Sequence, residues 1–409
     1  MVPDISRRRV LTSTGAAAGL LPIGTLLSDR RSDSERQHQS NDWPMERHNP
    51  AGTGYAPNAR GPKHAVSVRW KQRIETSLGA GYKPTPIVAD GLVYGAGQQL
   101  ICADTASGET VFRTDRNYNS PPTIARSRAY RSPTLAFSTP RGAEGLHAHG
   151  DQALAGVPVG RTRWSVGDEK EHSLLFGGQP SVSIPVASNG IVFVISNDTL
   201  HAIDASSGRV RWQREGDGRR PAVRNGTVYV TDYSKGVFGY DIETGKQTFS
   251  ATPSHGALSV TAAPTLLIAD MDSRLIGLDY EGTTVWRYNP ADLSRDGGPI
   301  AVADGVAYAG FNGNRRSPLV AIDTVDGTER WRSDVSIEST PQFAPPAIAD
   351  GVIYIPVEDE GLTAIDTRDG SVLWQFVPSD RAGPGSPAAL ADGTLYTLGS
   401  DHLYALEEA

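Results

Sequence analysis

The side chains best suited to binding a metal ion are gathered in three short stretches of the sequence. His147, His149 and Asp151 alternate with other residues, so on a strand they would face the same side and could share one ion. Carboxylates gather at 270–272 and 358–360, where their oxygens could bind Ca²⁺. Neither acidic stretch has the spacing of a calcium-binding loop, and we expect both to be solvated turns. The two histidines align with an ordinary strand of the repeat described below, so the sequence predicts no metal site.

Motifs for nucleophilic catalysis and phosphate binding are missing as well. The single cysteine, Cys102, cannot form an intramolecular disulfide, and it stands where other repeats carry alanine. We therefore expect Cys102 to be a small buried side chain rather than a nucleophile. Glycine-rich phosphate loops, the serine elbow of hydrolases and the paired histidines of metalloproteases do not occur in a suitable context. The sequence predicts no catalytic residue.

Charge and composition exclude one class of function and favour one class of fold. The formal net charge is −7, with no basic run or face to attract a nucleic acid, so no nucleic-acid partner is expected. The 44 glycines and 28 prolines, with only three methionines, suit short strands joined by tight turns better than long helices. We expect an all-β protein.

The N-terminus has the form of an export signal. Arg7 and Arg8 lie in a Ser-Arg-Arg-x-apolar-apolar sequence that resembles twin-arginine signals, and the uncharged stretch 10–27 follows it. We expect a signal over 1–28 and a polar disordered spacer over 29–42. A disordered tail is the alternative to a signal, and an uncleaved membrane anchor also remains open.

From about Trp43 onward the chain repeats itself, and two signatures alternate along it. The first is a turn dipeptide followed by a β run with an aromatic residue at its third position, which is a hairpin pattern. Its aromatic positions are Tyr94, Phe193, Tyr229, Tyr308, Tyr354 and Tyr396. We interpret 126–130 and 263–267 as degenerate copies of this hairpin, which brings the number of copies to eight.

The second signature is an aspartate, a turn that ends in glycine, and then a closing aromatic residue. The aspartate can accept hydrogen bonds from turn amides, and the glycine can take a positive φ angle, so a fixed turn keeps the aromatic residue in register on the next strand. The closing aromatics lie about 43 residues apart, which matches the length of a four-stranded propeller blade. They are Trp70, Phe112, Trp164, Trp212, Phe249, Trp286, Trp331 and Trp374.

These eight repeats predict an eight-bladed β-propeller over residues 43–409. The last hairpin, at 392–396, is followed by one further strand pattern but by no closing tryptophan, whereas the segment from Val66 to Trp70 supplies one. We therefore expect this N-terminal strand to complete the last blade and close the ring.

At this point the residues resemble a known family. The repeat Ala-x-Asp-x-x-(Thr/Ser)-Gly-x-x-x-Trp is nearly intact from Ala202 to Trp212, and it resembles the tryptophan-docking motif of PQQ quinoprotein propellers. The segments 43–45 and 53–55 are similar to the lead-in of many members. The resemblance covers about residues 43–409, and it implies that each closing aromatic packs between neighbouring blades. It is specific for fold and poor for function.

The family resemblance leaves two functions open. Large quinoprotein dehydrogenases of the family hold PQQ and Ca²⁺ with the help of a disulfide between adjacent cysteines, which the lone Cys102 cannot form. The chain therefore resembles more closely the non-catalytic members, such as the propeller lipoprotein of outer-membrane β-barrel assembly, and we expect no cofactor. A PQQ-dependent dehydrogenase that oxidises an alcohol or sugar is the alternative, and a polysaccharide-binding propeller is a third possibility.

The expected function is therefore that of an exported, extracytoplasmic scaffold that binds a protein or peptide in the cell envelope. We expect a monomer that associates with a membrane only if its signal stays uncleaved. Loops on a rigid frame are the places where such proteins bind. The candidate partner-binding residues are Leu174, Leu175 and Phe176 in the long segment 165–184, and Arg315 and Arg316 in a long loop of the sixth blade. Simple surface solvation is the alternative for the two arginines.

Overall fold

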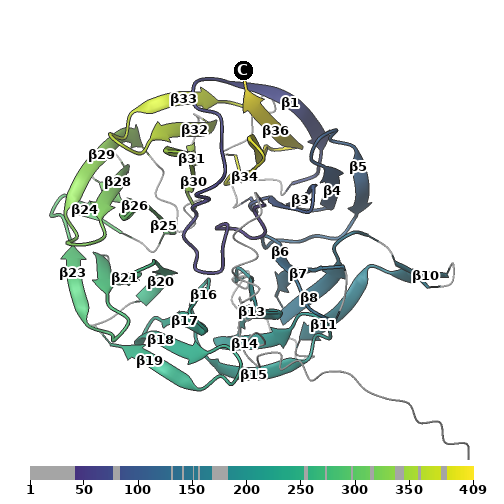
Figure 1. Ribbon diagram of the computed structural model, residues 1–409, viewed down its shortest axis with the longest axis horizontal. Helices are drawn as coiled ribbons and strands as arrows, with labels where there is room; N and C mark the ends of the chain where they lie inside the picture. Colours follow the sequence, from purple (N-terminus) through teal and green to yellow (C-terminus); the bar gives the residue numbers. More distant parts are fainter. Residues whose placement is uncertain are drawn as a thin grey trace, which may run out of the picture.

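The computed structural model describes residues 42–76, 83–129, 132–140, 142–150, 152–154, 157–167, 183–252, 257–271, 274–295, 298–313, 317–336, 345–357, 361–378 and 385–409. Within these residues the chain forms eight four-stranded sheets, arranged in a ring around a common centre (Figure 1). This confirms the predicted all-β fold and the eight-bladed propeller. No helix long and apolar enough to cross a membrane is found in the part of the chain that the structure describes.

The first four blades follow one another along the chain, each running from an inner strand to an outer one. Blade 1 contains β2 (Ile87–Ala89), β3 (Leu92–Ala96), β4 (Leu100–Asp104) and β5 (Thr110–Thr114). Blade 2 contains β6 (Thr123–Ala125), β7 (Thr134–Thr139), β8 (Gly142–His147) and β11 (Thr162–Gly167). Blade 3 contains β12 (Val186–Ser188), β13 (Ile191–Ser196), β14 (Thr199–Asp204) and β15 (Val210–Glu215). Blade 4 contains β16 (Ala222–Arg224), β17 (Thr227–Asp232), β18 (Gly236–Asp241) and β19 (Gln247–Ala251).

The remaining blades complete the ring. Blade 5 contains β20 (Ala257–Ala262), β21 (Leu267–Met271), β22 (Arg274–Leu278) and β23 (Thr284–Tyr288). Blade 6 contains β25 (Ile300–Ala303), β26 (Val306–Gly310), β28 (Pro318–Asp323) and β29 (Glu329–Ser336). Blade 7 contains β30 (Ala347–Ala349), β31 (Val352–Val357), β32 (Gly361–Asp366) and β33 (Val372–Phe376). Blade 8 contains β34 (Ala389–Ala391), β35 (Thr394–Leu398), β36 (His402–Glu408) and the N-terminal β1 (Val66–Arg73).

The N-terminal strand closes the ring as predicted. β1 pairs antiparallel with β36 from Val66 opposite Glu408 to Arg73 opposite His402, and it forms the outer strand of blade 8. One sheet therefore contains both ends of the folded chain, and blade 8 depends on residues that are more than 300 positions apart.

Two short strand pairs lie outside the eight blades. β9 (Gln152–Leu154) and β10 (Val157–Gly160) form a hairpin in the connection between the last two strands of blade 2, and this hairpin projects outward from the ring (Figure 1). β24 (Leu293–Ser294) pairs with β27 (Asn312–Gly313) beside blades 5 and 6.

The inner hairpins of blades 2 and 5 differ from the sequence interpretation. In blade 1, Ile87 pairs with Tyr94, and the equivalent pairs are Thr123 with Ala136 and Val260 with Ala269. Alanine therefore occupies the aromatic position in both blades, and the expected positions, 130 and 267, were wrong by six residues in blade 2 and by two in blade 5. The connection between the first two strands is longer there than in the other repeats, which shifts the second strand along the sequence.

Antiparallel strand order gives the ring two different faces. The turns between the first and second strands, such as Asp90-Gly91, lie on the same side as the turns between the third and fourth strands, and we call this side the hairpin face. The turns between the second and third strands lie on the opposite side together with the connections between blades, and we call this side the loop face.

Candidate functional site

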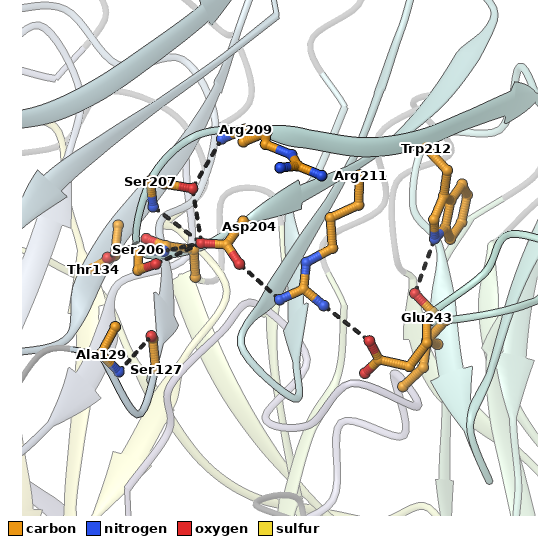
Figure 2. A network of polar contacts seen from close by, with 12 residues as sticks. Ser127, Ala129, Thr134, Asp204, Ser206, Ser207, Arg209, Arg211, Trp212 and Glu243 are labelled. Atoms are coloured by element: carbon orange, nitrogen blue, oxygen red, sulfur yellow. Dashed lines mark hydrogen bonds and ion pairs between the residues drawn. The ribbon is translucent and has the colours of Figure 1, made fainter.

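The repeated turn of the second signature is well defined in blade 3 (Figure 2). The Oδ1 atom of Asp204 accepts hydrogen bonds from the backbone amides of Ser206 and Ser207, each at 3.1 Å, and its Oδ2 atom lies 2.7 Å from Arg211. Partial burial would raise the pKa of Asp204, but hydrogen bonds from Ser206, Arg211 and Ser207 outweigh it and hold that pKa well below its usual range. Gly208 closes the turn with φ +73°. The charged aspartate therefore organises the turn.

The same turn receives the closing tryptophan of the preceding blade. The indole Nε1 of Trp164 donates to the carbonyl of Ala205 at 2.9 Å, and a Cβ atom on Gly208 would lie only 2.6 Å from Trp164. Only glycine leaves room for the indole here, and it also accepts the positive φ angle. Equivalent hydrogen bonds of 2.9 to 3.1 Å join Trp70 to Thr105, Trp212 to Ile242, Trp286 to Thr324, Trp331 to Thr367 and Trp374 to Pro62.

The aromatic residue of the first signature takes part in the same contact between neighbouring blades. In blade 7 the hydroxyl of Tyr354 donates to the carbonyl of Pro62 at 2.9 Å, the carbonyl that also accepts from Trp374. Tyr396 and Trp70 converge in the same way on the carbonyl of Thr105. In six blades the two aromatic rings also lie against each other, with centroids 5.5 to 6.5 Å apart. Both sequence signatures therefore act together at the boundary between blades.

Phenylalanine replaces tryptophan where the next blade lacks the usual turn. Phe112 faces Gly150 of blade 2, and Phe249 faces Gly282 of blade 5, where the turn is one residue shorter than in the other repeats. In blade 2 the carbonyl of Ala148, at the position of Ala205, accepts the hydroxyl of Tyr94 at 3.1 Å. Phenylalanine, whose side chain has no N–H group to donate, therefore lies beside both altered turns.

Two grooves adjoin blade 3. The groove between blades 2 and 3 has a volume of about 270 Å³ and contains the apolar side chains of Val166, Val194 and Ile203. The groove between blades 3 and 4 has a volume of about 490 Å³, and its lining includes the charged side chains of Arg214 and Glu215. Thr199 and Gln213 line both, so the grooves meet at the outer corner of blade 3.

The predicted partner-binding residues lie outside the described residues. They are Leu174, Leu175, Phe176, Arg315 and Arg316. The signal residues Arg7 and Arg8 also lie outside the part of the chain that the structure describes. The long segment proposed at 165–184 begins inside a strand, because β11 extends to Gly167. β11 ends on the loop face at Gly167, which lines the first groove.

The histidine pair is not contained in one strand as expected, because β8 ends at His147 and His149 lies in the turn that follows. The Nδ1 atom of His147, at the end of β8, lies 2.9 Å from the guanidinium of Arg163, and burial together with that positive charge lowers the pKa of His147. His149 lies 3.8 Å from Asp90, and Asp151 falls outside the described residues. Among the residues that the structure places, no three histidine, cysteine or acidic side chains gather as metal ligands.

Asp270 corrects one expectation from the sequence. It belongs to β21 rather than to a solvated turn, and its Oδ2 atom lies 2.7 Å from the Nε atom of Arg295, with both side chains fully buried. The other nitrogens of Arg295 donate to the carbonyls of Gly310 and Gly298. The apolar run 266–269 before Asp270 was the signal for a strand, but nothing in the sequence pointed to Arg295.

Cys102 is buried between blades, as expected. It lies on β4 opposite Tyr94 and Phe112, with no exposed surface, and burial raises its pKa to about 12. We predict that a thiol reagent such as a maleimide modifies Cys102 only when the protein unfolds. Labelling followed by mass spectrometry against denaturant concentration should track the unfolding transition seen by tryptophan fluorescence. Rapid labelling of the native protein would contradict this prediction.

Comparison with known proteins shows the family. The family model described as outer membrane protein assembly factor BamB matches residues 152–281 and 271–409, which is more than half of the chain. A serine/threonine-protein kinase AfsK from Streptomyces griseus is 28% identical over 54% of this chain and 33% of its own length. The outer membrane protein assembly factor BamB of Moranella endobia is 23% identical over 47% of this chain and 43% of its own length. The chain thus spans less than half the length of these relatives.

Solved structures share the fold at low sequence identity. A quinohemoprotein alcohol dehydrogenase from Pseudomonas putida HK5 superposes with a TM-score of 0.67 at 12% identity, over 91% of this chain and 81% of the enzyme. BamB from Moraxella catarrhalis gives a TM-score of 0.59 at 14% identity, over 84% of this chain and 98% of BamB. At such identity the likeness shows the fold alone, whereas the family model matches the sequence itself. The chain therefore belongs to the propeller family described as outer membrane protein assembly factor BamB.

Proposed function

We propose that this protein is a non-catalytic scaffold of the cell envelope that binds an extended segment of a partner protein on its loop face. The two grooves that meet at blade 3 are the observation that carries the proposal. Their lining combines the apolar side chains of Val166, Val194 and Ile203 with polar groups from Thr199 and Gln213. Such a lining suits a peptide, whose main chain needs polar partners and whose side chains need apolar contacts.

The choice of face rests on how the N-terminus folds. Residues 43–63 run through the centre of the ring on their way to β1 (Figure 1), and Tyr55 among them donates to Asp304 in a turn of the hairpin face. Most other turns of the hairpin face are short and of the two repeated types, although blade 2 has a longer connection between its first two strands and the β9–β10 hairpin between its last two. On the loop face, β11 ends at Gly167, and the predicted partner-binding residues Leu174–Phe176 follow it in the sequence. Loops of varied length on a rigid frame are commonly used to bind partners rather than to stabilise the fold.

Photocrosslinking would test the proposed binding face. A photoreactive amino acid at the exposed position Gln213 should trap one discrete envelope protein in the native cells. The control is the same amino acid at Val325, which is 78% exposed and lies in a turn of the hairpin face. Equal crosslinking from both positions, or none from Gln213, would count against the proposal.

A PQQ-dependent dehydrogenase is the second candidate, favoured by the structural likeness to the quinohemoprotein alcohol dehydrogenase. The residues present do not fit the cofactor site that the family resemblance implies. Cys102 lies inside blade 1 between Tyr94 and Phe112, and the chain has no second cysteine for a disulfide. Calorimetric titration with PQQ and Ca²⁺, followed by a dye-reduction assay with alcohols and sugars, should show neither binding nor turnover. Stoichiometric binding with turnover would replace the scaffold by an enzyme.

Export through the twin-arginine pathway is part of the same proposal. We predict that replacing Arg7 and Arg8 by lysine retains the full-length protein in the cytoplasm, because the motif is read by its receptor rather than by charge alone. Fractionation and immunoblotting would measure this. Arg9→Lys is the matched control, since Arg9 occupies the variable position of the motif. Unchanged export of the double variant would remove the pathway from the proposal.

A further inference from the structure

The segment from Trp43 to Ala56 lies inside the ring and connects blades that are distant in sequence. Its carbonyl oxygens accept hydrogen bonds of 2.7 to 3.0 Å from inner-strand amides of six blades. These bonds run from Val88 to Trp43, Ile124 to Pro44, Val223 to Pro50, Ala262 to Ala51, Val302 to Thr53 and Ile348 to Gly54. The amides of Trp43 and Ala56 donate back to Val88 and Ile348, at the two ends of the segment. One short segment therefore joins blades 1, 2, 4, 5, 6 and 7.

The apolar side chains at the start of this segment are buried between blades. Trp43 and Met45 are 1% and 0% exposed, and Trp43 packs in the cluster that contains Val88 and Leu390 of two blades. The indole of Trp43 also donates to the carbonyl of Glu46 at 3.2 Å, which fixes the first turn of the segment. This apolar end is anchored where the ring is closed by β1.

Charged side chains fix the middle of the segment. The Oε2 atom of Glu46 lies 3.5 Å from Arg220 and 3.9 Å from Arg47, and all three side chains are at most 3% exposed. Arg47 donates to the hydroxyl of Thr261 at 3.0 Å, and Arg220 donates to the carbonyl of Asn49 at 3.2 Å. Buried charges are tolerated only with such partners, so the docked position of the segment is specified by geometry as well as by apolar burial.

Both ends are held by aspartates of the hairpin turns. At the entrance, Arg126 binds Asp90 through two hydrogen bonds of 2.9 Å and lies 3.6 Å from Asp42. At the exit, the hydroxyl of Tyr55 donates to Asp304 at 3.0 Å. The Asp-Gly dipeptides that the sequence marks only as turns thus have a second use in blades 1 and 6.

We propose that residues 43–56 form a latch that undocks as one unit while the eight blades stay folded. The inner strands that bind the latch are short, and each is already paired with the second strand of its own blade. Release of the latch therefore breaks bonds between blades but leaves every sheet intact. Undocking opens the centre of the ring from the hairpin face and loosens six blades at once, so that the latch controls the rigidity of the ring.

Hydrogen exchange of the intact protein tests the latch. The amides of the six inner-strand donors should exchange through one common opening, with less protection than second-strand amides such as those of Phe193 and Ile353. Six unrelated exchange rates would overturn the proposal, and so would protection equal to that of the second strands, because the latch would then open only with global unfolding.

A substitution in the latch sharpens the test. Trp43→Ala should speed exchange of all six amides by about a hundredfold, since truncating a buried tryptophan shifts an equilibrium by at least two factors of ten. Exchange at Phe193 and Ile353 should speed up by the same factor, because global unfolding also breaks the contacts of Trp43, so the difference in protection between the two groups should persist. The matched control is Tyr233→Ala, at a position 62% exposed on the loop face, which should alter none of these amides. Loss of that difference in the Trp43→Ala protein would show that latch and blades open as one cooperative unit, against the proposal.

Discussion

Replacing Trp212 with alanine is expected to lower the free energy of unfolding by about 3–5 kcal/mol, the usual cost of truncating a buried tryptophan. Trp212 is 9% exposed, packs against Gly245 of blade 4 and donates to the carbonyl of Ile242 at 3.0 Å. The alanine variant loses the apolar contact and leaves the carbonyl without its donor. Denaturant unfolding followed by circular dichroism would measure the change, with Val372→Ala on the exposed outer surface as a control expected to stay within about 0.5 kcal/mol.

Swapping tryptophan and phenylalanine at the blade boundaries distinguishes the stability that comes from the hydrogen bond from the stability that comes from packing. Trp212→Phe keeps a ring but removes the N–H donor, which should cost about 1–3 kcal/mol. Phe249→Trp places a larger ring against the altered turn at Gly282, and overpacking there should also cost about 1–3 kcal/mol. At each boundary, the native aromatic residue is thus expected to give the more stable protein. A neutral Trp212→Phe or a stabilising Phe249→Trp would show that the turn of the next blade does not select the ring.

The docking contacts show how far sequence analysis reaches. The constant spacing from Asp204 to Gly208 and Trp212 predicts a fixed turn, because all three residues belong to one local unit. The acceptor of Trp212 lies in a different repeat, on a carbonyl that carries no sequence signal. The convergence of Tyr354 and Trp374 on Pro62 was equally hidden, because Pro62 lies in the N-terminal segment, about 290 positions away. Local geometry was therefore predictable, and partners between blades were not.

The candidate binding site was harder to predict from the sequence than the fold was. The repeat predicted eight blades, their closure by β1 and the burial of Cys102, because each follows from a pattern seen several times along the chain. The groove beside blade 3 is lined by Gly142 and Ala143, where the equivalent strand of blade 3 has Thr199 and Leu200. A groove that forms where residues are small leaves no positive motif in a single sequence. Leu174, Leu175, Phe176, Arg315 and Arg316 remain predictions.

Asp270→Asn is expected to cost about 3–5 kcal/mol of stability, because it leaves the guanidinium of Arg295 charged and buried without its carboxylate. The pair has no exposed surface, so water cannot replace the lost partner. Denaturant unfolding would again measure the effect. The matched control is Glu243→Gln, which breaks the ion pair with Arg211 across blades 3 and 4. Glu243 is 56% exposed, and the loss there should be below about 1 kcal/mol.

A double-mutant cycle with Arg295→Met tests whether the pair acts as a unit. Asp270→Asn combined with Arg295→Met should cost less than the two single changes added together, with a coupling energy of about 1–3 kcal/mol. The double variant removes the buried charge, although it still leaves the carbonyls of Gly298 and Gly310 without the guanidinium donor. It should therefore recover only part of the loss. Additive effects would mean that Asp270 and Arg295 stabilise the boundary of blades 5 and 6 independently, and Arg295 would then be held by those two carbonyls rather than by the carboxylate.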